Sequence, residues 1–336
     1  MKRHQHVGRT AAVLAGGAVF WLVCSTAVRA ELHYGSLALQ NDLFLGRDGG
    51  GYTNGIFLSS IRMPSPDEES VAPPLLLSGP VAGWLGLSGA TLSASSLGQV
   101  MITPKDITRR HPDPSDTPYV GALMYRSAQV HVRGDVADMA ALSVGVVGPA
   151  SGAEQAQKLV HRIVGADRPE GWGTQVSNKP LVGIERYRAW RFADGRGGGI
   201  GSDVILQGGG TVGSLESSVG GSVLFRYGTR LARSFPTTMR VSSSNADPFV
   251  IGPGWFVFAG LSADRMLNHT SISRSSPSLD GAARLRKTRT IMTLGVAYGW
   301  ARSSLTFSLQ SVNPLMESST KRQSYGSLTY VFNLDR

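Results

Sequence analysis

The sequence predicts an all-β fold, a twelve-stranded antiparallel transmembrane β-barrel with one short helix in an extracellular loop. Three observations support this prediction. Apolar residues alternate with small or polar ones along many segments, which is the period of a β-strand. Only 17% of the 336 residues are charged, whereas soluble proteins usually carry about a quarter. Glycine is abundant, with 42 residues, yet no stretch after residue 30 is long and apolar enough for a membrane helix.

The first thirty residues are predicted to be a secretory signal peptide that is cleaved after Ala30. The segment begins with basic residues, continues through an apolar, small-residue stretch over 10–28, and ends in a small residue. An uncleaved anchor helix is the alternative. Cys24, the only cysteine, lies in this segment, so the mature chain would have no thiol and no disulfide. Residues 31–336 would then form a single barrel domain.

The formal net charge of +10 raises the question of a nucleic-acid partner. Four of the 33 basic residues lie in the predicted signal peptide, so the mature chain has 29 basic and 23 acidic residues and a charge of +6. The remaining basic residues are scattered, and no Lys/Arg tract is longer than pairs such as Arg109-Arg110 and Lys321-Arg322. Nucleic acid is therefore a poor partner, whereas a mild attraction to anionic lipid head groups remains.

The alternation is clear near the C-terminus, where Leu305, Phe307 and Leu309 are apolar and the residues between them are polar. The second face of these segments holds glycine, alanine, serine and threonine, whereas a soluble sheet turns charged residues to water. A membrane barrel has this pattern, with apolar side chains outward, small or polar ones inward, and aromatics such as Tyr298 and Trp300 near the interfaces. A periplasmic sandwich is the alternative fold.

An even number of strands leaves both termini of a bacterial barrel on the periplasmic side, so the loops after odd-numbered strands are expected outside the cell. The stretches 64–90 and 234–253 are interpreted as long connections, and the glycine runs 197–199 and 208–210 as turns. The predicted strands are 32–42, 52–62, 91–103, 118–132, 138–147, 180–192, 200–212, 220–231, 254–265, 287–300, 303–312 and 323–333.

One helix interrupts the strand pattern, between the fifth and sixth strands. Ser151 and Glu154 have the spacing of a capping box, in which each side chain accepts a hydrogen bond from the other residue's backbone amide. Apolar residues then recur at helical spacing, and Gly165 is a natural C-terminal stop. The sequence therefore predicts a helix over 151–165.

His161 is the strongest catalytic candidate on this helix. Gln157 lies four residues earlier, so both side chains share one face with Glu154, away from Leu159 and Ile163. A histidine with a near-neutral pKa can accept a proton from water, and a neighbouring glutamine can orient it. A solvated helix face is the alternative interpretation. No Ser/His/Asp arrangement is recognisable elsewhere in the chain.

Asn41 and Asp42 supply side-chain oxygens at the end of the first predicted strand, and Asp48 follows in the loop. Hard oxygen ligands suit calcium, as does the lack of clustered cysteine and histidine. An Asn-Asp pair is also a common turn signal. Because adjacent strand residues point to opposite faces, the pair converges on one site only if the strand ends or bulges there. Lys105 and Arg109 follow the third strand on the same rim, where they would meet phosphate groups or water.

An ordered set of motifs between about residues 37 and 190 resembles the lipid A 3'-O-deacylase family of Gram-negative outer membranes. The motifs are, in order, Asn41-Asp42-Leu43-Phe44, Asp48, Tyr52-Thr53-Asn54-Gly55, Thr103-Pro104, Pro118-Tyr119-Val120-Gly121, Val147-Gly148-Pro149, Gln157, His161 and Gly171-Trp172. Each motif is weak alone, but the ordered set is specific. The C-terminal third resembles the family only as barrel strands.

The resemblance implies an outer-membrane barrel that removes the 3'-linked acyloxyacyl group from lipid A in the outer leaflet, with lipopolysaccharide as its membrane partner and calcium as its cofactor. The family's catalytic histidine and glutamine fall on His161 and Gln157. Its Asn-Asp pair falls on Asn41 and Asp42, and its threonine on Thr53. A monomer is favoured.

The chain departs from the family at one basic position. A lysine that the family carries after its Thr/Ser-Pro turn falls on Arg109, which keeps the charge but changes its shape. The phosphate contact or the substrate preference is therefore open. In the mechanism that we expect, His161 deprotonates a water that attacks the ester, calcium near Asn41 and Asp42 stabilises the oxyanion, and the basic loop meets the glucosamine phosphates. An outer-membrane phospholipase and a non-catalytic barrel or porin remain alternatives.

Overall fold

The computed structural model describes residues 31–42, 51–65, 68–77, 89–113, 116–194, 199–214, 216–239, 247–268, 286–314, 317, 320 and 322–335. The predicted signal peptide with Cys24 lies outside these ranges, as does Asp48. Within them, no helix has the length and apolar character needed to cross a membrane.

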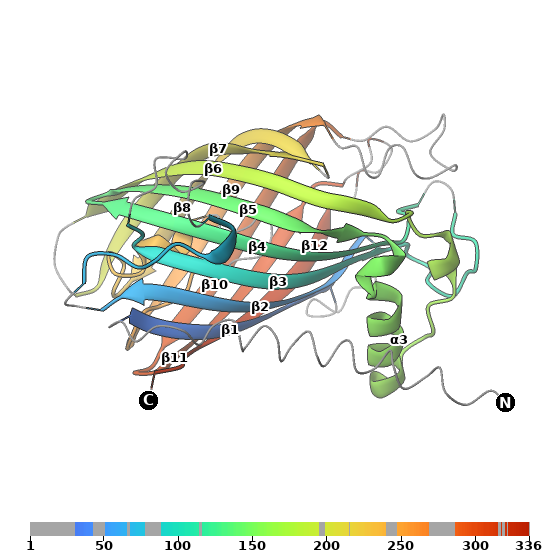
Figure 1. Ribbon diagram of the computed structural model, residues 1–336, viewed down its shortest axis with the longest axis horizontal. Helices are drawn as coiled ribbons and strands as arrows, with labels where there is room; N and C mark the ends of the chain where they lie inside the picture. The colour runs from blue at the N-terminus through green and yellow to red at the C-terminus, as the bar shows by residue number, and fades with distance from the viewer. Residues whose placement is uncertain are drawn as a thin grey trace.

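Twelve antiparallel strands form a closed barrel (Figure 1). Each strand pairs with the next, and β1 pairs with β12 to close the ring, so the predicted fold class is confirmed. Predicted and observed bounds agree to within two residues except at β8 and at the end of β9. The strands are β1 Glu31–Asn41, β2 Gly51–Pro64, β3 Leu92–Thr103, β4 Val120–Arg133, β5 Val136–Val147, β6 Lys179–Asp194, β7 Gly201–Gly213, β8 Ser217–Gly228, β9 Gly254–Asn268, β10 Thr288–Gly299, β11 Ser303–Val312 and β12 Gln323–Asn333.

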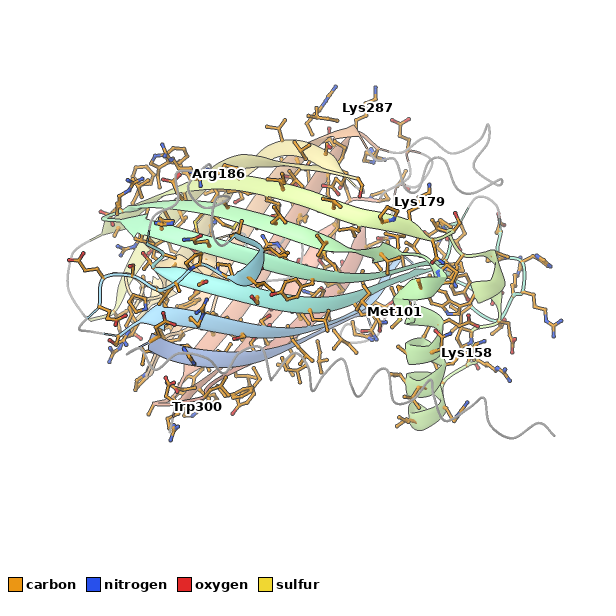
Figure 2. All side chains as sticks on the ribbon, viewed as in Figure 1. Met101, Lys158, Lys179, Arg186, Lys287 and Trp300 are labelled. Carbon is orange, nitrogen blue, oxygen red and sulfur yellow. The ribbon has the colours of Figure 1, made fainter. Side chains whose placement is uncertain are left out.

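The outer surface of β6 to β12 carries the predicted apolar band. Met292, Leu294 and Val296 alternate outward along β10 and are exposed, as a lipid-facing strand requires. Exposed aromatic residues gather at one end of this band, the end that also holds the C-terminus; Figure 2 shows Trp300 there, far from helix α3 (Ala153–Val164). β1 begins and β12 ends there, as expected of the periplasmic end of a bacterial barrel, and its aromatic girdle comprises Trp190, Phe192, Tyr227, Tyr298, Trp300 and Tyr330.

Strand β8 was predicted three residues too late at both ends. The predicted strand extends to Leu231, but β8 ends at Gly228, and the Leu231 side chain packs in a buried cluster with Phe256 and Phe258. The Leu231 carbonyl also accepts a hydrogen bond from Nη2 of Arg226 at 2.8 Å. Its apolar character therefore serves packing inside the barrel.

The glycine run 208–210 is not a turn, which corrects the prediction. It lies in the middle of β7, opposite residues 186–188 of β6. A Cβ on Gly209 would lie 2.2 Å from the Arg186 carbonyl oxygen and 2.6 Å from the Tyr187 ring. Glycine is therefore needed because the Tyr187 ring lies against the neighbouring backbone. Of the second glycine run, 197–199, only Gly199 lies in the described residues.

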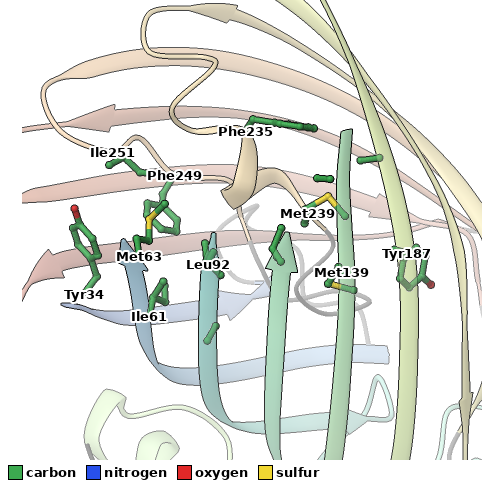
Figure 3. Close-up of a cluster of buried hydrophobic side chains, with 14 of the residues drawn as sticks. Tyr34, Ile61, Met63, Leu92, Met139, Tyr187, Phe235, Met239, Phe249 and Ile251 are labelled. Carbon is green, nitrogen blue, oxygen red and sulfur yellow. The ribbon is translucent and has the colours of Figure 1, made fainter. Parts of the chain in front are cut away.

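The lumen is not uniformly small and polar as predicted, because the connection from β8 to β9 folds into it. This connection includes the short helix η5 (Phe235–Thr238). Figure 3 shows its apolar side chains packing against those of the strands, close to their periplasmic ends. The periplasmic half of the barrel is therefore filled by the chain itself, and the labelled side chains of this cluster are Tyr34, Ile61, Met63, Leu92, Met139, Tyr187, Phe235, Met239, Phe249 and Ile251.

Charged side chains inside the barrel form buried ion pairs. Arg126 donates from Nε and Nη2 to the two carboxylate oxygens of Glu185, at 3.0 Å each. Arg226 forms a similar bidentate pair with Asp203, donating from Nε and Nη2 at 2.9 and 2.6 Å. Asp247, on the inserted connection, accepts from the Ser308 hydroxyl at 2.7 Å. Such pairing offsets the cost of removing these charges from water.

One sector of the outer wall is covered by the chain rather than by lipid. Outward-facing residues of β3 and β4 are polar here, and the segment 68–77, with the short helix η2 (Leu75–Leu77), crosses over them (Figure 1, dark teal). The Leu76 amide donates to the Ser127 hydroxyl at 3.4 Å, and Nη2 of Arg62 donates to the Ala72 carbonyl at 3.0 Å. The buried Ser127 hydroxyl thereby has a hydrogen-bond partner, as its burial demands.

The Arg126–Glu185 pair provides a stability test. Glu185→Leu leaves the Arg126 guanidinium buried without its partner, and we expect a loss of about 3–5 kcal/mol in the free energy of unfolding. The double variant Arg126→Met/Glu185→Leu should recover most of it, because it removes both charges. The urea midpoint, followed by the gel mobility of unheated barrel, measures the effect. Equal midpoints for wild type and Glu185→Leu would contradict the expectation.

Candidate functional site at the barrel rim

The predicted site residues come from strand ends and loops at the end of the barrel opposite the aromatic girdle. The end of β1, the start of β2, the loop after β3 and helix α3 after β5 all lie there (Figure 1). The rim predicted from strand parity is thus formed by segments more than a hundred residues apart in sequence.

Helix α3 begins and is capped differently from the prediction. Its N-cap is Gly152, in a left-handed conformation with φ 70°, and no side chain caps it, so the Ser151–Glu154 capping box is wrong. Ser151 belongs instead to the short helix η3 (Pro149–Ser151), and Glu154 accepts from Nζ of Lys158 at 2.6 Å. The predicted C-terminal stop is confirmed, because Gly165 caps the helix with φ 71°.

The start of α3 packs against the outside of the barrel wall. A Cβ on Gly121 of β4 would lie 2.4 Å from both the Ala153 Cβ and the Ser151 hydroxyl, so only glycine allows this approach. Nε2 of Gln99 on β3 donates to the Ser151 carbonyl at 2.7 Å. Burial of the Ser151 side chain in this contact explains why it cannot serve as the helix cap.

An aromatic pair packs the loop after α3 against the outer wall at β3 and β4. Trp172, in the short helix η4 (Gly171–Thr174), lies 4.8 Å from Tyr119 between ring centroids, and both are buried with Met101 and Ala153. The Tyr119 hydroxyl donates to the Ile107 carbonyl at 3.1 Å. Burial raises the pKa of the Tyr119 phenol to about 12, so it remains a proton donor at physiological pH.

Gln157 is hydrogen-bonded to the tryptophan of this pair. Its side chain is 4% exposed, and its Oε1 accepts a hydrogen bond from the Trp172 indole nitrogen at 2.7 Å. An indole N–H can only donate, so the orientation of the amide is determined and its NH₂ group is left as the donor. Position 157 therefore joins helix α3 to the wall.

His161 lies one turn further along α3 and is partly exposed. Its Nδ1 lies 2.6 Å from the Asp167 carbonyl oxygen, in the loop that follows the helix. A carbonyl can only accept, so Nδ1 carries the proton and Nε2 of the neutral ring is the basic nitrogen. Leu159 and Ile163 are exposed on another face of α3, as the helical spacing predicts.

Strand register places Asn41 beside the helix. Residues Asn41, Asn54, Met101 and Gly121 are successive partners across β1, β2, β3 and β4. Strands are about 4.8 Å apart, so Asn41 lies roughly 10 Å along the wall from Met101, which contacts the α3 cluster.

The strand irregularities that an Asn-Asp site needs are present at this edge. β1 ends at Asn41, so Asp42 is already outside the strand. The pairing of β2 with β3 shifts between Tyr52 and Asn54, which makes Thr53 the extra residue of a β-bulge. Bulges at barrel rims redirect side chains.

The two predicted phosphate-binding residues lie in the loop after β3. The Lys105 amide donates to the Asp116 carboxylate at 2.8 Å, and its side chain is exposed. Arg109 is exposed, but its Nε donates to Asp106 at 3.0 Å. Hydrogen bonds from Thr108 lower the pKa of Asp106, so this carboxylate is ionised and partly neutralises Arg109.

A metal site is not formed by acidic or histidine side chains alone. In the part of the chain that the structure describes, no group of three or more His, Cys, Asp or Glu side chains is arranged to hold a metal ion. The predicted oxygen ligands at this rim are Asn41 and Asp42. Calcium therefore remains a prediction.

The sequence alone does not indicate that Trp172, Tyr119 and Gln99 attach helix α3 and its loop to the barrel wall. Trp172 and Tyr119 were noted only as motif residues, and Gln99 was not singled out. Their roles depend on contacts between loops and strands far apart in sequence. The available signal was that Trp172 stands in a predicted loop and Tyr119 at the start of a predicted strand, both next to the rim.

The fold and this rim define a membrane barrel whose polar cluster lies on the outer wall, reachable from the lipid. The family model described as outer membrane protein LpxR matches residues 13–334, and the chain belongs to this family. The resemblance to the lipid A 3'-O-deacylase family is thereby confirmed, and the protein is an integral outer-membrane protein of the lipid A deacylase class.

A solved structure shares this fold. LpxR from Salmonella typhimurium superimposes with a TM-score of 0.72 at 18% identity, covering 89% of this chain and 99% of that one. The translocator domain of the autotransporter NalP from Neisseria meningitidis has a TM-score of 0.43 at 11% identity, covering 97% of this chain and 96% of that one. No match was found among curated protein sequences.

The Trp172–Gln157 bond can be tested by Trp172→Phe. This variant keeps the ring packing but leaves the Gln157 carbonyl without its donor, which costs about 1–3 kcal/mol for a buried acceptor. We expect roughly tenfold slower lipid A deacylation, while the urea midpoint of the barrel should change little because this bond lies outside the strand pairing. Trp190→Phe, in the periplasmic girdle, is the matched control. Equal activity of the two variants would show that the bond does not position the site.

Proposed function

We propose that this protein removes the 3'-linked acyloxyacyl chain from lipid A by water attack that His161 activates. The observation that carries the proposal is the hydrogen bond from Nδ1 of His161 to the Asp167 carbonyl, which leaves Nε2 as a base. This histidine belongs to a helix packed on the outer wall, and a lipid in the outer leaflet reaches that wall directly. Membership of the LpxR family supports the substrate class.

The chemistry needs one proton carrier. Nε2 of His161 takes a proton from water while the water oxygen attacks the ester carbonyl, and a tetrahedral oxyanion forms. When the intermediate collapses, the bond to the glucosamine 3'-oxygen breaks and the imidazolium returns the proton to that oxygen. The products are a free acyloxyacyl acid and lipid A with a 3'-hydroxyl. Gln157, Thr53 and Asn41 would position the substrate and the oxyanion, and Lys105 and Arg109 would meet its phosphates.

The rim suits calcium in its donor chemistry. Asn41 and Asp42 offer an amide and a carboxylate oxygen where β1 ends, and backbone carbonyls beside the β2 bulge add oxygens of the same type. These residues would hold the ion, which would supply positive charge near the developing oxyanion. The remaining ligands would be water and substrate oxygens.

Neither alternative function is favoured by the contacts. A serine-dependent phospholipase needs a nucleophile beside the base, but Ser151 is buried under Gly121 and accepts from the Ala153 amide at 3.4 Å. A porin needs an open lumen, whereas the connection with Phe235 and Phe249 fills the periplasmic half. Release of fatty acid from glycerophospholipid would still be measured beside lipid A.

Mass spectrometry of lipid A tests the proposal directly. Cells that produce the wild type should show loss of the 3'-acyloxyacyl mass, and His161→Ala should reduce the purified enzyme's rate by about 100-fold or more, because general-base catalysis contributes that much. His111→Ala is the matched control, since His111 is an exposed histidine of the same rim. Fully acylated lipid A in cells that produce the wild-type protein, or full activity of His161→Ala, would refute the proposal.

Chelation tests the calcium step. Excess EGTA should abolish deacylation by purified enzyme, and added Ca²⁺ should restore it, whereas Mg²⁺ should restore little because it demands a tighter octahedral shell. Asp42→Asn should raise the Ca²⁺ concentration needed for half-maximal activity, because it removes a charged ligand. Full activity in EGTA would eliminate the metal from the mechanism while leaving the histidine test intact.

A further inference from the structure

Helix α3 carries an apolar flank that no part of the described chain covers. The flank consists of Leu159, Val160 and Ile163, and the Leu159 and Ile163 side chains are 54% and 73% exposed. The wall-facing side of the same helix, with Ala153 and Gln157, is buried. The exposed residues recur at the i, i+4 spacing of one helix stripe, so they form a continuous surface rather than scattered positions.

The opposite flank is basic and faces away from the barrel. Lys158 and Arg162 lie there, together with Glu154, the ion-pair partner of Lys158, and Figure 2 shows Lys158 on the side of α3 that is turned away from the strands. Successive helical residues are rotated by about 100°, so Ile163 lies roughly 140° around the helix from Lys158. The apolar flank therefore points to the side of the helix on which the strands lie.

The helix axis also suits a position in the membrane surface. Figure 1 shows α3 running across the direction of the strands at the rim, so in a membrane that surrounds the barrel the helix lies parallel to the bilayer plane. The outer wall below the same rim is apolar too, because Leu39 of β1 and Leu58 of β2 are exposed on its surface.

We propose that α3 is an interfacial helix whose apolar flank inserts among the acyl chains of the outer leaflet while Lys158 and Arg162 contact lipid phosphates. An apolar stripe opposite a basic face is the arrangement by which helices lie in a bilayer interface. This anchoring goes beyond the proposed reaction and does not depend on it. It would keep His161, on the head-group side of the helix, at the depth where glucosamine esters lie.

Spin labels measure this depth without any assay of activity. We suggest full-length protein carrying Cys24→Ser, so that the chain has no native cysteine, with a nitroxide on Leu159→Cys or Ile163→Cys. Labels on Lys158→Cys and Arg162→Cys are the matched controls from the same helix. The protein is reconstituted in vesicles of phosphatidylethanolamine and phosphatidylglycerol, and accessibility to oxygen and to a water-soluble nickel chelate is compared.

The proposal expects the ratio of oxygen to nickel accessibility to be severalfold higher at positions 159 and 163 than at 158 and 162, because oxygen concentrates in hydrocarbon and the chelate in water. Equal ratios at all four positions would place the flank in water and overturn it. Low accessibility to both reagents at 159 and 163 would mean that a second copy of the protein covers the flank, which also overturns it.

Discussion

Backbone pairing inside hydrocarbon is the constraint on which this structure depends. An unpaired amide or carbonyl facing lipid costs several kcal/mol, so a sheet can cross a membrane only when it closes on itself. Closure of β1 onto β12 satisfies that constraint for all twelve strands. It also creates two different surfaces, a lumen and an outer wall, and each must be filled or covered. The inserted connection with Phe235 fills one, whereas lipid and the segment 68–77 cover the other.

The site follows from placing a helix on that outer wall. Gly121 lets α3 touch β4, and Trp172 and Tyr119 hold the loop that follows it. A helix in this place presents His161 beside the lipid rather than inside the lumen. The plugged lumen and the external site agree with each other, because a lipid substrate does not need to pass through the barrel.

The fold could be predicted because alternation is a local property. A residue such as Leu294 must face lipid whichever strands flank it, so its type alone indicates its side. Local rules failed where tertiary contacts take a residue away from its usual role. Ser151 has a capping-box spacing but is buried beneath Gly121, and Gly209 resembles a turn but makes room for the Tyr187 ring. The lumen was misjudged for the same reason, because Leu231 and Phe249 pack across the barrel rather than along a strand.

By itself, the sequence determined the strand number, the apolar outer band, the gathering of rim loops and the candidates His161 and Gln157, because strand period, helical spacing and strand parity need no knowledge of distant contacts. Only the tertiary structure decided that Gln157 bonds Trp172, that Asp167 sets the tautomer of His161, and that Arg109 is engaged by Asp106. These are contacts between a side chain and a loop. Loop conformations depend on the packing of the whole rim, so no local pattern encodes them.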